Sequence, residues 1–209
     1  MGNAKIFVVS APSGCGKGTI LAEVFKTSDA FYSVSCTTRG PREGEKNGVD
    51  YHFITQEKFD EMIDNNEFLE YARFVNKSYG SPAKPIDDAL AQGRDAILEI
   101  ETQGAFQVKE VRPESVSIFI LPPSVAELHR RLRKRGTEKE DVILKRLAQA
   151  KGEIERSIKY DYVIMNDDLD DAVRDFETIV KAVKENTDAA DRFKAENMTD
   201  MINEVLKNA

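Results

Sequence analysis

The segment "SAPSGCGKGTI" (10–20) has the residue types of a phosphate-binding loop. It follows the apolar run "KIFVVS" and leads into a stretch of helical periodicity, which is the strand–loop–helix context that such a loop requires. Gly14 and Gly16 let the backbone curl with its N–H groups facing phosphate oxygens, and the positive end of the next helix adds attraction. Lys17 then stands near the terminal phosphates of a nucleoside triphosphate. The segment predicts a nucleotide site, against the alternative of a glycine-rich turn with an incidental lysine.

This loop departs from the common form G-x-x-x-x-G-K-[ST] at two positions. Ala11 replaces the first glycine, and Gly18 replaces the hydroxyl residue that holds Mg²⁺, with Thr19 one position later. Thr19 is rotated by about 100° further round the helix. We therefore expect Mg²⁺ to be held mainly by phosphates and waters, with Thr19 and Glu99 as further contributors. A G-K-G-T ending also occurs in small nucleoside monophosphate kinases, so it argues more against a GTPase or motor than against a kinase.

Glu99 and Glu101 lie two positions apart on a predicted strand, so their side chains share one face. At the carboxyl end of that strand they face the crevice where open α/β sheets bind ligands. They are candidates for holding metal-bound waters or for orienting an acceptor molecule. The alternative is a solvated pair at a strand exit, although carboxylates there are costly to bury unless they are compensated.

The elements that position these residues follow an alternating pattern. Buried strands are predicted at 5–10, 95–101, 115–121 and 162–167, with amphipathic helical segments between and after them, which predicts an α/β fold. The predicted inner helix faces are Ile20, Leu21, Val24 and Phe25; Val142, Ile143, Leu147, Ala150 and Ile154; Val173, Phe176, Ile179, Val180 and Val183. A last helix is predicted within 191–209, with Met198, Met201, Ile202 and Val205 on its inner side.

Two stretches interrupt this alternation. Residues 33–84 contain short strand-like runs and one helix-like stretch, "QEKFDEMIDN", and the segment "HRRLRKRGTEKED" (129–141) is highly charged. We expect a core formed by 1–34, 85–125 and 147–209, a mixed α/β subdomain at 35–84, and a short lid at 126–146. The role of the last helix, as a dimer contact in a homo-oligomer or as a cover of the core, is open.

Composition limits the classes of partner. The chain has 209 residues, 41% hydrophobic and 32% charged, with a formal charge of -7. This charge argues against a protein that coats nucleic acid, and no apolar run is long enough to cross a membrane. The two cysteines, Cys15 and Cys36, have no metal-type spacing, and no signal peptide is recognisable. We expect reduced thiols and a cytoplasmic protein.

Seven segments together resemble the guanylate kinase family and occur in that family's order. They are "SAPSGCGKGT", "SVSCTTRGPREGEKNGVDYHFI", "EFLEYARFVNKSYGSP", "ILEIETQGA", "IFILPPS", "RLRKRGTE" and "DYVIMNDD". The T-T-R-x-P-R-x-G-E-x-x-G-x-D-Y run is the most specific of them. The resemblance implies a P-loop parallel sheet flanked by helices, with an inserted GMP-binding subdomain and a lid. It also implies transfer of the terminal phosphoryl group of ATP to GMP, giving ADP and GDP with Mg²⁺.

The resemblance assigns residues to the acceptor GMP. Arginine forks suit phosphate, and a carboxylate accepts from both N1–H and the 2-amino group of guanine, which adenine does not offer. The implied GMP-binding residues are Ser35, Arg39, Arg42, Tyr51, Glu70, Tyr79, Ser81, Glu99 and Glu101. Lys77 and Ser78 depart from the common G-N-Y-Y-G form, and the two strand glutamates replace the aspartates of some members.

The resemblance also assigns residues to the donor. The implied ATP-binding residues are Ala11, Pro12, Ser13, Gly14, Cys15, Gly16, Lys17, Gly18, Thr19 and Asn166. The implied catalytic residues, which neutralise the transferring phosphoryl group, are Lys17, Arg39, Arg131, Arg135 and Arg146. Two alternatives stay open: a peptide-binding scaffold domain that has lost catalysis, and a kinase of the same fold for AMP or a sugar bisphosphate.

Overall fold

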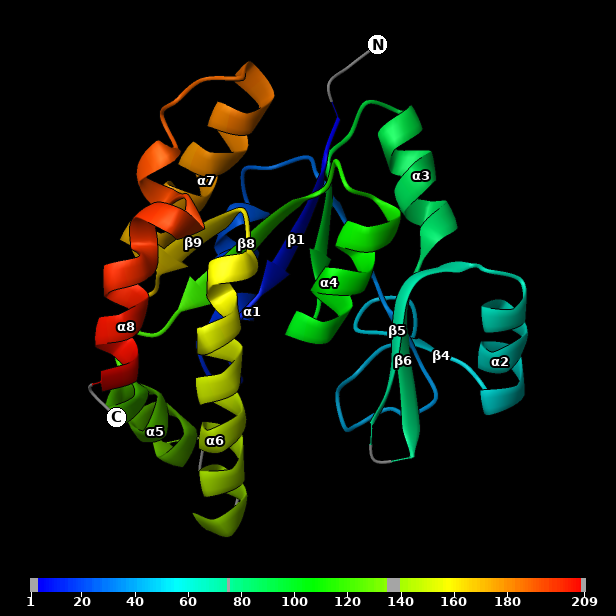
Figure 1. Ribbon diagram of the computed structural model, residues 1–209. Helices are drawn as coiled ribbons and strands as arrows, with labels where there is room; N and C mark the ends of the chain where they lie inside the picture. Colours follow the sequence, from blue (N-terminus) through cyan, green and yellow to red (C-terminus); the bar gives the residue numbers. More distant parts are fainter. Residues whose placement is uncertain (1–3, 75, 135–139, 208–209) are drawn as a thin grey trace. The chain divides into compact units, whose positions relative to one another are not determined.

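The computed structural model describes residues 4–74, 76–134 and 140–207 (Figure 1). Its contacts divide the chain into two compact units. The first unit comprises Met1–Val8 and Asp29–Ser115, and the second comprises Val9–Ser28 and Val116–Ala209. The boundary falls inside strand β1 (Ile6–Ser10), so this strand contributes residues to both units.

The main sheet has five strands in the order β2-β7-β1-β8-β9. Besides β1 they are β2 (Phe31–Tyr32), β7 (Ala96–Glu99), β8 (Val116–Leu121) and β9 (Tyr162–Met165). The β2–β7 and β8–β9 pairs are parallel, and β1 and β8 are buried along their whole length. A continuous apolar run is the pattern of a strand covered on both faces. The four strands predicted from such runs are confirmed, but β7 ends at Glu99. Glu101 is the exposed N-cap residue of α4, so the prediction that both glutamates lie on one strand face is wrong, because the chain turns into the helix directly after β7.

The first unit also contains a four-stranded sheet in the order β4-β3-β6-β5. Its strands are β3 (Cys36–Thr37), β4 (His52–Phe53), β5 (Phe68–Phe74) and β6 (Lys77–Pro82). The helices of this unit are α2 (Gln56–Asp64), α3 (Ala83–Ala91) and α4 (Thr102–Val111). Phe59 and Met62 of α2 pack with Cys36 to form a small separate core. The mixed sheet and helix expected within 33–84 are confirmed.

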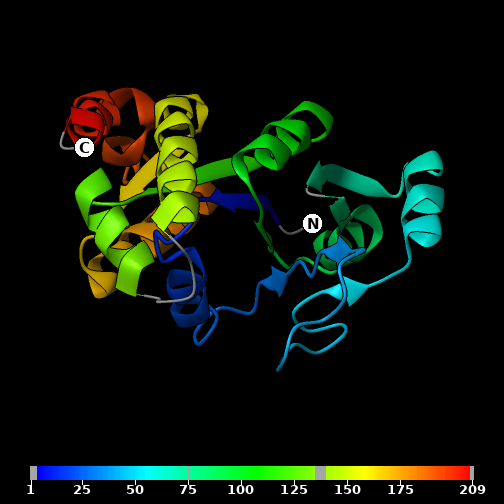
Figure 2. The same ribbon diagram turned by 90° about the horizontal axis from the view of Figure 1, so that it is seen from below.

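The second unit contains the remaining helices: α1 (Lys17–Val24), α5 (Val125–Lys134), α6 (Glu140–Arg156), α7 (Leu169–Glu185) and α8 (Thr199–Lys207). Short 3₁₀ turns lie at η1 (Ser157–Lys159), η2 (Asp191–Phe193) and η3 (Ala195–Met198). Helix α8 lies beside α6 (Figures 1 and 2). None of the helices in the described ranges is long and apolar enough to cross a membrane.

Some details differ from the sequence predictions. Within 191–207 two 3₁₀ turns precede α8, so this part of the predicted segment is not one continuous helix, and Met201 is exposed. Val142 is also exposed, because the buried face of α6 follows Ile143, Leu147, Ala150 and Ile154. Strand β6 was not predicted, since its serines, glycine and proline are typical of turns. The charged stretch 129–141 is helical as far as Lys134 and again from Glu140.

Candidate functional site

The phosphate-binding loop connects β1 to α1, which begins at Lys17 as predicted. Gly14 and Gly16 have φ angles of +94° and +90°, in the left-handed region that favours glycine. Side chains are also excluded by space. A Cβ on Gly16 would lie 2.6 Å from Nδ2 of Asn166, and one on Gly14 would lie 2.9 Å from Cδ2 of Leu132. The positive φ angles therefore favour glycine at both positions, and a larger residue would also displace the side chain of Asn166 or Leu132.

Side chains from other elements hold the backbone of this loop. The amide Nδ2 of Asn166 donates to the carbonyl oxygen of Cys15 at 2.6 Å, and Nη1 of Arg131 donates to the same oxygen at 3.5 Å. Nη2 of Arg131 also donates to the carbonyl of Asn166 at 3.2 Å. Glu127, one turn earlier on α5, accepts from Nε of Arg131 at 2.8 Å. A chain of polar contacts thus joins α5, the end of β9 and the loop.

A second cation reaches the loop from α6. Nη1 of Arg146 donates to the hydroxyl of Ser13 at 2.9 Å. Together with Lys17 and Arg131 this places positive charge from three helices around one backbone loop, which suits a polyphosphate. Thr19 is exposed at the first turn of α1. Arg135, which was predicted as a further cation of this set, lies outside the described residues.

The two cysteines are free and buried. Burial raises the pKa of the Cys15 thiol to about 12, although the charges of Arg131 and Lys17 oppose this shift. Burial likewise raises the pKa of Cys36 to about 11. Both side chains are therefore protonated thiols at neutral pH, and a thiol is a poor nucleophile. The position of Cys15 in the loop reflects packing, with Sγ donating to the carbonyl of Ile120 at 3.4 Å.

In the first unit, Arg39 is held by a carboxylate. Its Nη1 and Nη2 donate to Oε2 and Oε1 of Glu45 at 2.8 and 3.0 Å, and the two side chains are only 14% and 17% exposed. Glu45 also accepts from the backbone N–H of Arg42 at 2.7 Å. The hydrogen bonds from Arg39, followed by that from Arg42, lower the pKa of Glu45 to about 2. The guanidinium lies 5.2 Å from the ring centre of Tyr51.

Aromatic hydroxyls gather beside this arginine. The rings of Tyr51 and Tyr79 meet edge to face with their centres 6.1 Å apart. The hydroxyl of Tyr32 donates to Oε2 of Glu99 at 2.9 Å. Burial, followed by the charge of Glu99, raises the pKa of Tyr32 above its usual range. This neighbourhood offers a guanidinium and phenol groups to an anion.

Glu70 is a buried carboxylate, only 7% exposed. Its Oε1 accepts from the hydroxyl of Ser81 at 2.7 Å, and the hydroxyl of Ser35 lies 3.5 Å from that of Ser81. Burial raises the pKa of Glu70, while the hydroxyl and backbone N–H of Ser81 lower it and the charge of Glu101 raises it. Among the described residues no cation pairs with Glu70. A carboxylate in this state favours a ligand that brings hydrogen-bond donors.

An irregularity in strand β5 explains why Glu70 and its neighbour Leu69 are both buried. Strands β5 and β6 pair Phe68 with Pro82 but Glu70 with Ser81, so Leu69 is an extra residue at a β-bulge. The bulge breaks the alternation of a strand, and Leu69 and Glu70 are therefore buried in succession. A Cβ on Gly80 would meet the carbonyl of Glu70 at 3.0 Å, so glycine permits this close packing.

The predicted site residues thus fall into two sets, one in each unit. The residues assigned to GMP, from Ser35 to Glu101, all belong to the first unit, and the phosphate-loop residues with Arg131, Arg146 and Asn166 belong to the second. Within each unit the contacts above join most of them. Arg42 is exposed and takes part through its backbone N–H.

Sequence reasoning missed the residues that hold these side chains. Glu45, Tyr32 and Glu127 contact Arg39, Glu99 and Arg131 respectively. Two of these carry a sequence signal: Glu45 stands in the T-T-R-x-P-R-x-G-E run, and Glu127 precedes Arg131 at the helical spacing that favours ion pairs. The pairing of Tyr32 with Glu99 joins two strands that neighbour each other in the sheet and are distant in the sequence.

Several known proteins are similar to this chain over most of its length. A family model described as guanylate kinase matches residues 3–183. A guanylate kinase of Carboxydothermus hydrogenoformans is 52% identical over 88% of this chain and 91% of its own length. One from Vibrio vulnificus is 46% identical over 91% of this chain and 94% of its own length. A crystal structure of guanylate kinase from Anaplasma phagocytophilum matches with a TM-score of 0.70 and 35% identity, covering 87% of this chain and 86% of that one.

These matches extend over most of the chain and of each relative, and they include both sets of site residues. The chain belongs to the guanylate kinase family.

Proposed function

We propose that this protein is a guanylate kinase that transfers the terminal phosphoryl group of ATP to GMP, giving ADP and GDP. The family supports the reaction type and ATP as donor. The observation that carries the choice of acceptor is the buried Glu70 carboxylate with Ser81 and Ser35 beside it. Guanine offers N1–H and the 2-amino group to such a carboxylate, whereas adenine would leave it buried without donors.

The phosphate of GMP is proposed to bind Arg39, Arg42, Tyr51 and Tyr79. Glu45 accepts hydrogen bonds from both donors of the Arg39 fork. A phosphate is a stronger partner for such a fork, so we expect Arg39 to share its donors between Glu45 and the phosphate. Glu99 and Glu101 are proposed to orient the acceptor at the end of β7.

The phosphates of ATP are proposed to bind the loop from Ala11 to Thr19 with Lys17, Arg131 and Arg146. Phosphoryl transfer needs alignment and positive charge near the equatorial oxygens more than covalent help, and these three cations supply that charge. Asn166 is proposed as an adenine-side contact. Its amide Nδ2 donates to the loop carbonyl of Cys15, so its Oδ1 is the atom proposed to accept from the adenine side. Arg135 is proposed as a further cation by resemblance alone.

Mg²⁺ is proposed to accompany ATP. No group of three histidine, cysteine or acidic side chains suited to a metal is assembled within the described ranges. This fits a cation that keeps several waters and binds through nucleotide phosphates with one or two protein oxygens. The hydroxyl of Thr19 and the carboxylate of Glu99 have the oxygen chemistry that Mg²⁺ prefers, and the ion would neutralise phosphate charge. We also propose a cytoplasmic location, which the two free thiols favour.

The test is release of ADP by the purified protein with ATP, Mg²⁺ and each of GMP and AMP in turn. GMP-dependent release with little AMP-dependent release is expected. No release with GMP would favour a scaffold domain, and preference for AMP would favour the other kinase class.

The Glu70→Gln variant tests the acceptor assignment. Glutamine keeps the size of the side chain but turns an N–H group toward the donors of guanine. We expect kcat/KM for GMP to fall by about 10- to 100-fold, while KM for ATP stays within about twofold, since the change removes only contacts to the acceptor. Glu114→Gln, at an exposed position, is the matched control. Equal losses toward GMP and ATP would remove the specificity argument.

A further inference from the structure

Helix α4 packs against β5 within the first unit (Figure 1). One side chain of α4 is hydrogen-bonded to the backbone of the strand. Nε2 of Gln107 donates to the carbonyl of Tyr71, and Oε1 of Gln107 accepts from the N–H of Tyr71, both at 3.1 Å. Strand β5 is last in the order β4-β3-β6-β5, so no strand of the described residues pairs with this edge. The side-chain amide of Gln107 makes the two backbone hydrogen bonds with Tyr71 that a neighbouring strand would make. Tyr71 directly follows Glu70 in the chain.

One helical turn earlier, α4 passes close to the carboxylate of Glu70 itself. A Cβ built on Gly104 would lie 2.5 Å from Oε2 of Glu70, 3.0 Å from Cδ and 3.3 Å from Cγ. Gly104 is not among the described glycines that have a positive φ. Its backbone conformation is therefore one that residues other than glycine also adopt. A Cβ at this position would therefore displace the Glu70 carboxylate, since the three atoms nearest to it all belong to that side chain.

Gly104 and Gln107 lie three positions apart and so on the same face of the helix. That face makes two contacts with β5: Gln107 bonds the backbone of Tyr71, and Gly104 faces the side chain of Glu70. Gln107 fixes the backbone after Glu70, next to the irregular bulge at Leu69. Gly104 leaves room for Oε2, while Ser81 holds Oε1 from the opposite strand. The carboxylate is thus confined by α4, β5 and β6 together.

We infer that Gln107 and Gly104 are positioning residues for Glu70, and that they set the preference for guanine over other purine monophosphates. This inference rests on the proposed function. Neither residue is proposed to contact the base, since both act through Glu70. Their substitution should weaken recognition of the 2-amino group and N1–H of guanine and leave the phosphate-loop residues untouched.

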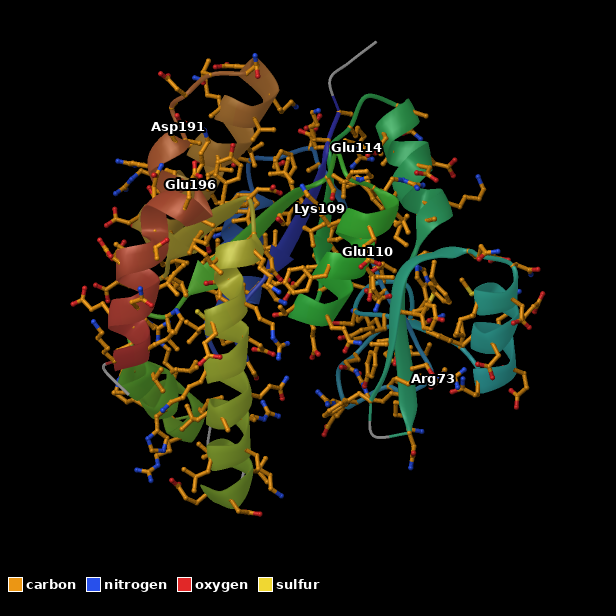
Figure 3. The ribbon with its side chains drawn as sticks, viewed as in Figure 1. Arg73, Lys109, Glu110, Glu114, Asp191 and Glu196 are labelled. Carbon is orange, nitrogen blue, oxygen red and sulfur yellow. The ribbon has the colours of Figure 1, made fainter. Side chains whose placement is uncertain are left out.

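Two variants remove the two contacts separately. Gln107→Met keeps the length of the side chain and loses both hydrogen bonds to Tyr71. Gly104→Ala adds one carbon that displaces the carboxylate, while alanine at a helical position favours the helix. Glu110→Met is the control, because Glu110 is an exposed residue of the same helix, one turn beyond Gln107 (Figure 3). All three are compared for thermal unfolding as well as for kinetics.

For Gln107→Met and Gly104→Ala we expect KM for GMP to rise about tenfold, with KM for ATP unchanged. The ratio of kcat/KM for GMP to that for inosine monophosphate, which keeps N1–H but lacks the 2-amino group, should fall by a similar factor. The Glu110→Met control should change neither value. Gly104→Ala should unfold at the wild-type temperature or above it, which a merely structural role of Gly104 does not predict.

A double-mutant cycle separates positioning from a direct role. If Gln107 acts through Glu70, then Gln107→Met in the Glu70→Gln background should cause little further loss toward GMP. Additive losses, or variants that discriminate GMP from inosine monophosphate as the wild type does, would overturn the inference. If Gln107→Met fails to fold, Gly104→Ala decides alone. A wild-type protein without GMP-dependent ADP release overturns the proposed function, whereas an active wild type with unaffected variants overturns only the inference.

Discussion

At the scale of single residues, two glutamates of the first unit have opposite electrostatic surroundings. Glu45 faces the Arg39 guanidinium, which lowers its pKa to about 2. Glu70 is buried with hydroxyl and N–H partners only, and burial raises its pKa. Glu45 is therefore paired with an arginine of the protein, whereas the carboxylate of Glu70 can still accept hydrogen bonds from a ligand. The same residue type thus serves two purposes because its neighbours differ.

The Glu45–Arg39 pair predicts a specific pH dependence of stability. Because the folded state lowers the pKa of Glu45 from its ordinary 4.5 to about 2, the ionised carboxylate stabilises the folded protein. This contribution is complete above about pH 4.5 and is lost as the pH falls toward 2. The Glu45→Gln variant should therefore have a lower urea midpoint than the wild type at pH 7, with a difference that shrinks between pH 4.5 and 3.

Glu43→Gln is the control for that measurement, because Glu43 is an exposed residue of the same loop. Its urea midpoint should follow that of the wild type at every pH. A constant difference between Glu45→Gln and the wild type from pH 7 to 3 would show that Glu45 stabilises the loop by packing and not by its charge.

At the scale of elements, the segment after α7 adds to the fold beyond the region that the family model matches, residues 3–183. The N–H of Ala195 donates to the carbonyl of Asp161 at 3.2 Å, just before β9. Phe193, Met198, Ile202 and Val205 are buried, and α8 contacts α6 (Figure 2). This segment covers the second unit and carries none of the predicted site residues.

Removing buried atoms from α8 should therefore affect stability and not catalysis. Ile202 is 4% exposed, so Ile202→Ala should lower the free energy of unfolding by about 2–4 kcal/mol through lost burial and a residual cavity. KM for both nucleotides should be unchanged at a temperature where the variant is folded. Urea unfolding and steady-state kinetics measure the two effects. Met201→Ala, at a 39% exposed position of the same helix, should change little. A raised KM without loss of stability would assign α8 a part in the site.

At the scale of the whole molecule, each unit carries the residues assigned to one nucleotide. The proposed reaction needs both nucleotides at once and needs water to be excluded from the transferring group. The division expected from the sequence, with a core, a GMP-binding subdomain at 35–84 and a lid at 126–146, remains a prediction about which parts move. Closure around substrates is how kinases meet this need.

Small-angle X-ray scattering tests such closure. We expect the radius of gyration to fall when GMP and a non-hydrolysable ATP analogue are both bound, and to fall less with either one alone, because each ligand orders only its own set of residues. The measurement compares the free protein, the two single complexes and the ternary complex. An unchanged radius in the ternary complex would contradict closure.

Much of the fold could be predicted from local patterns. Strands β1, β7, β8 and β9 are continuous apolar runs, and such a run is buried wherever it lies in the sheet. Strand β6 escaped prediction because Ser78, Gly80 and Pro82 have turn propensity, and its pairing with β5 outweighs that propensity. Val142 and Met201 were misplaced because apolar residues at the border of a helix face fit either side of it.

The sequence by itself determined the family, the phosphate loop and the residue types available for each nucleotide, because these depend on residue identity and spacing along the chain. Only the tertiary structure decided which groups hold those residues: Glu45 for Arg39, Tyr32 for Glu99, and α4 for Glu70. Such pairings depend on how elements pack and on a single extra residue at Leu69, and a one-residue change of register turns a side chain to the other face of a strand.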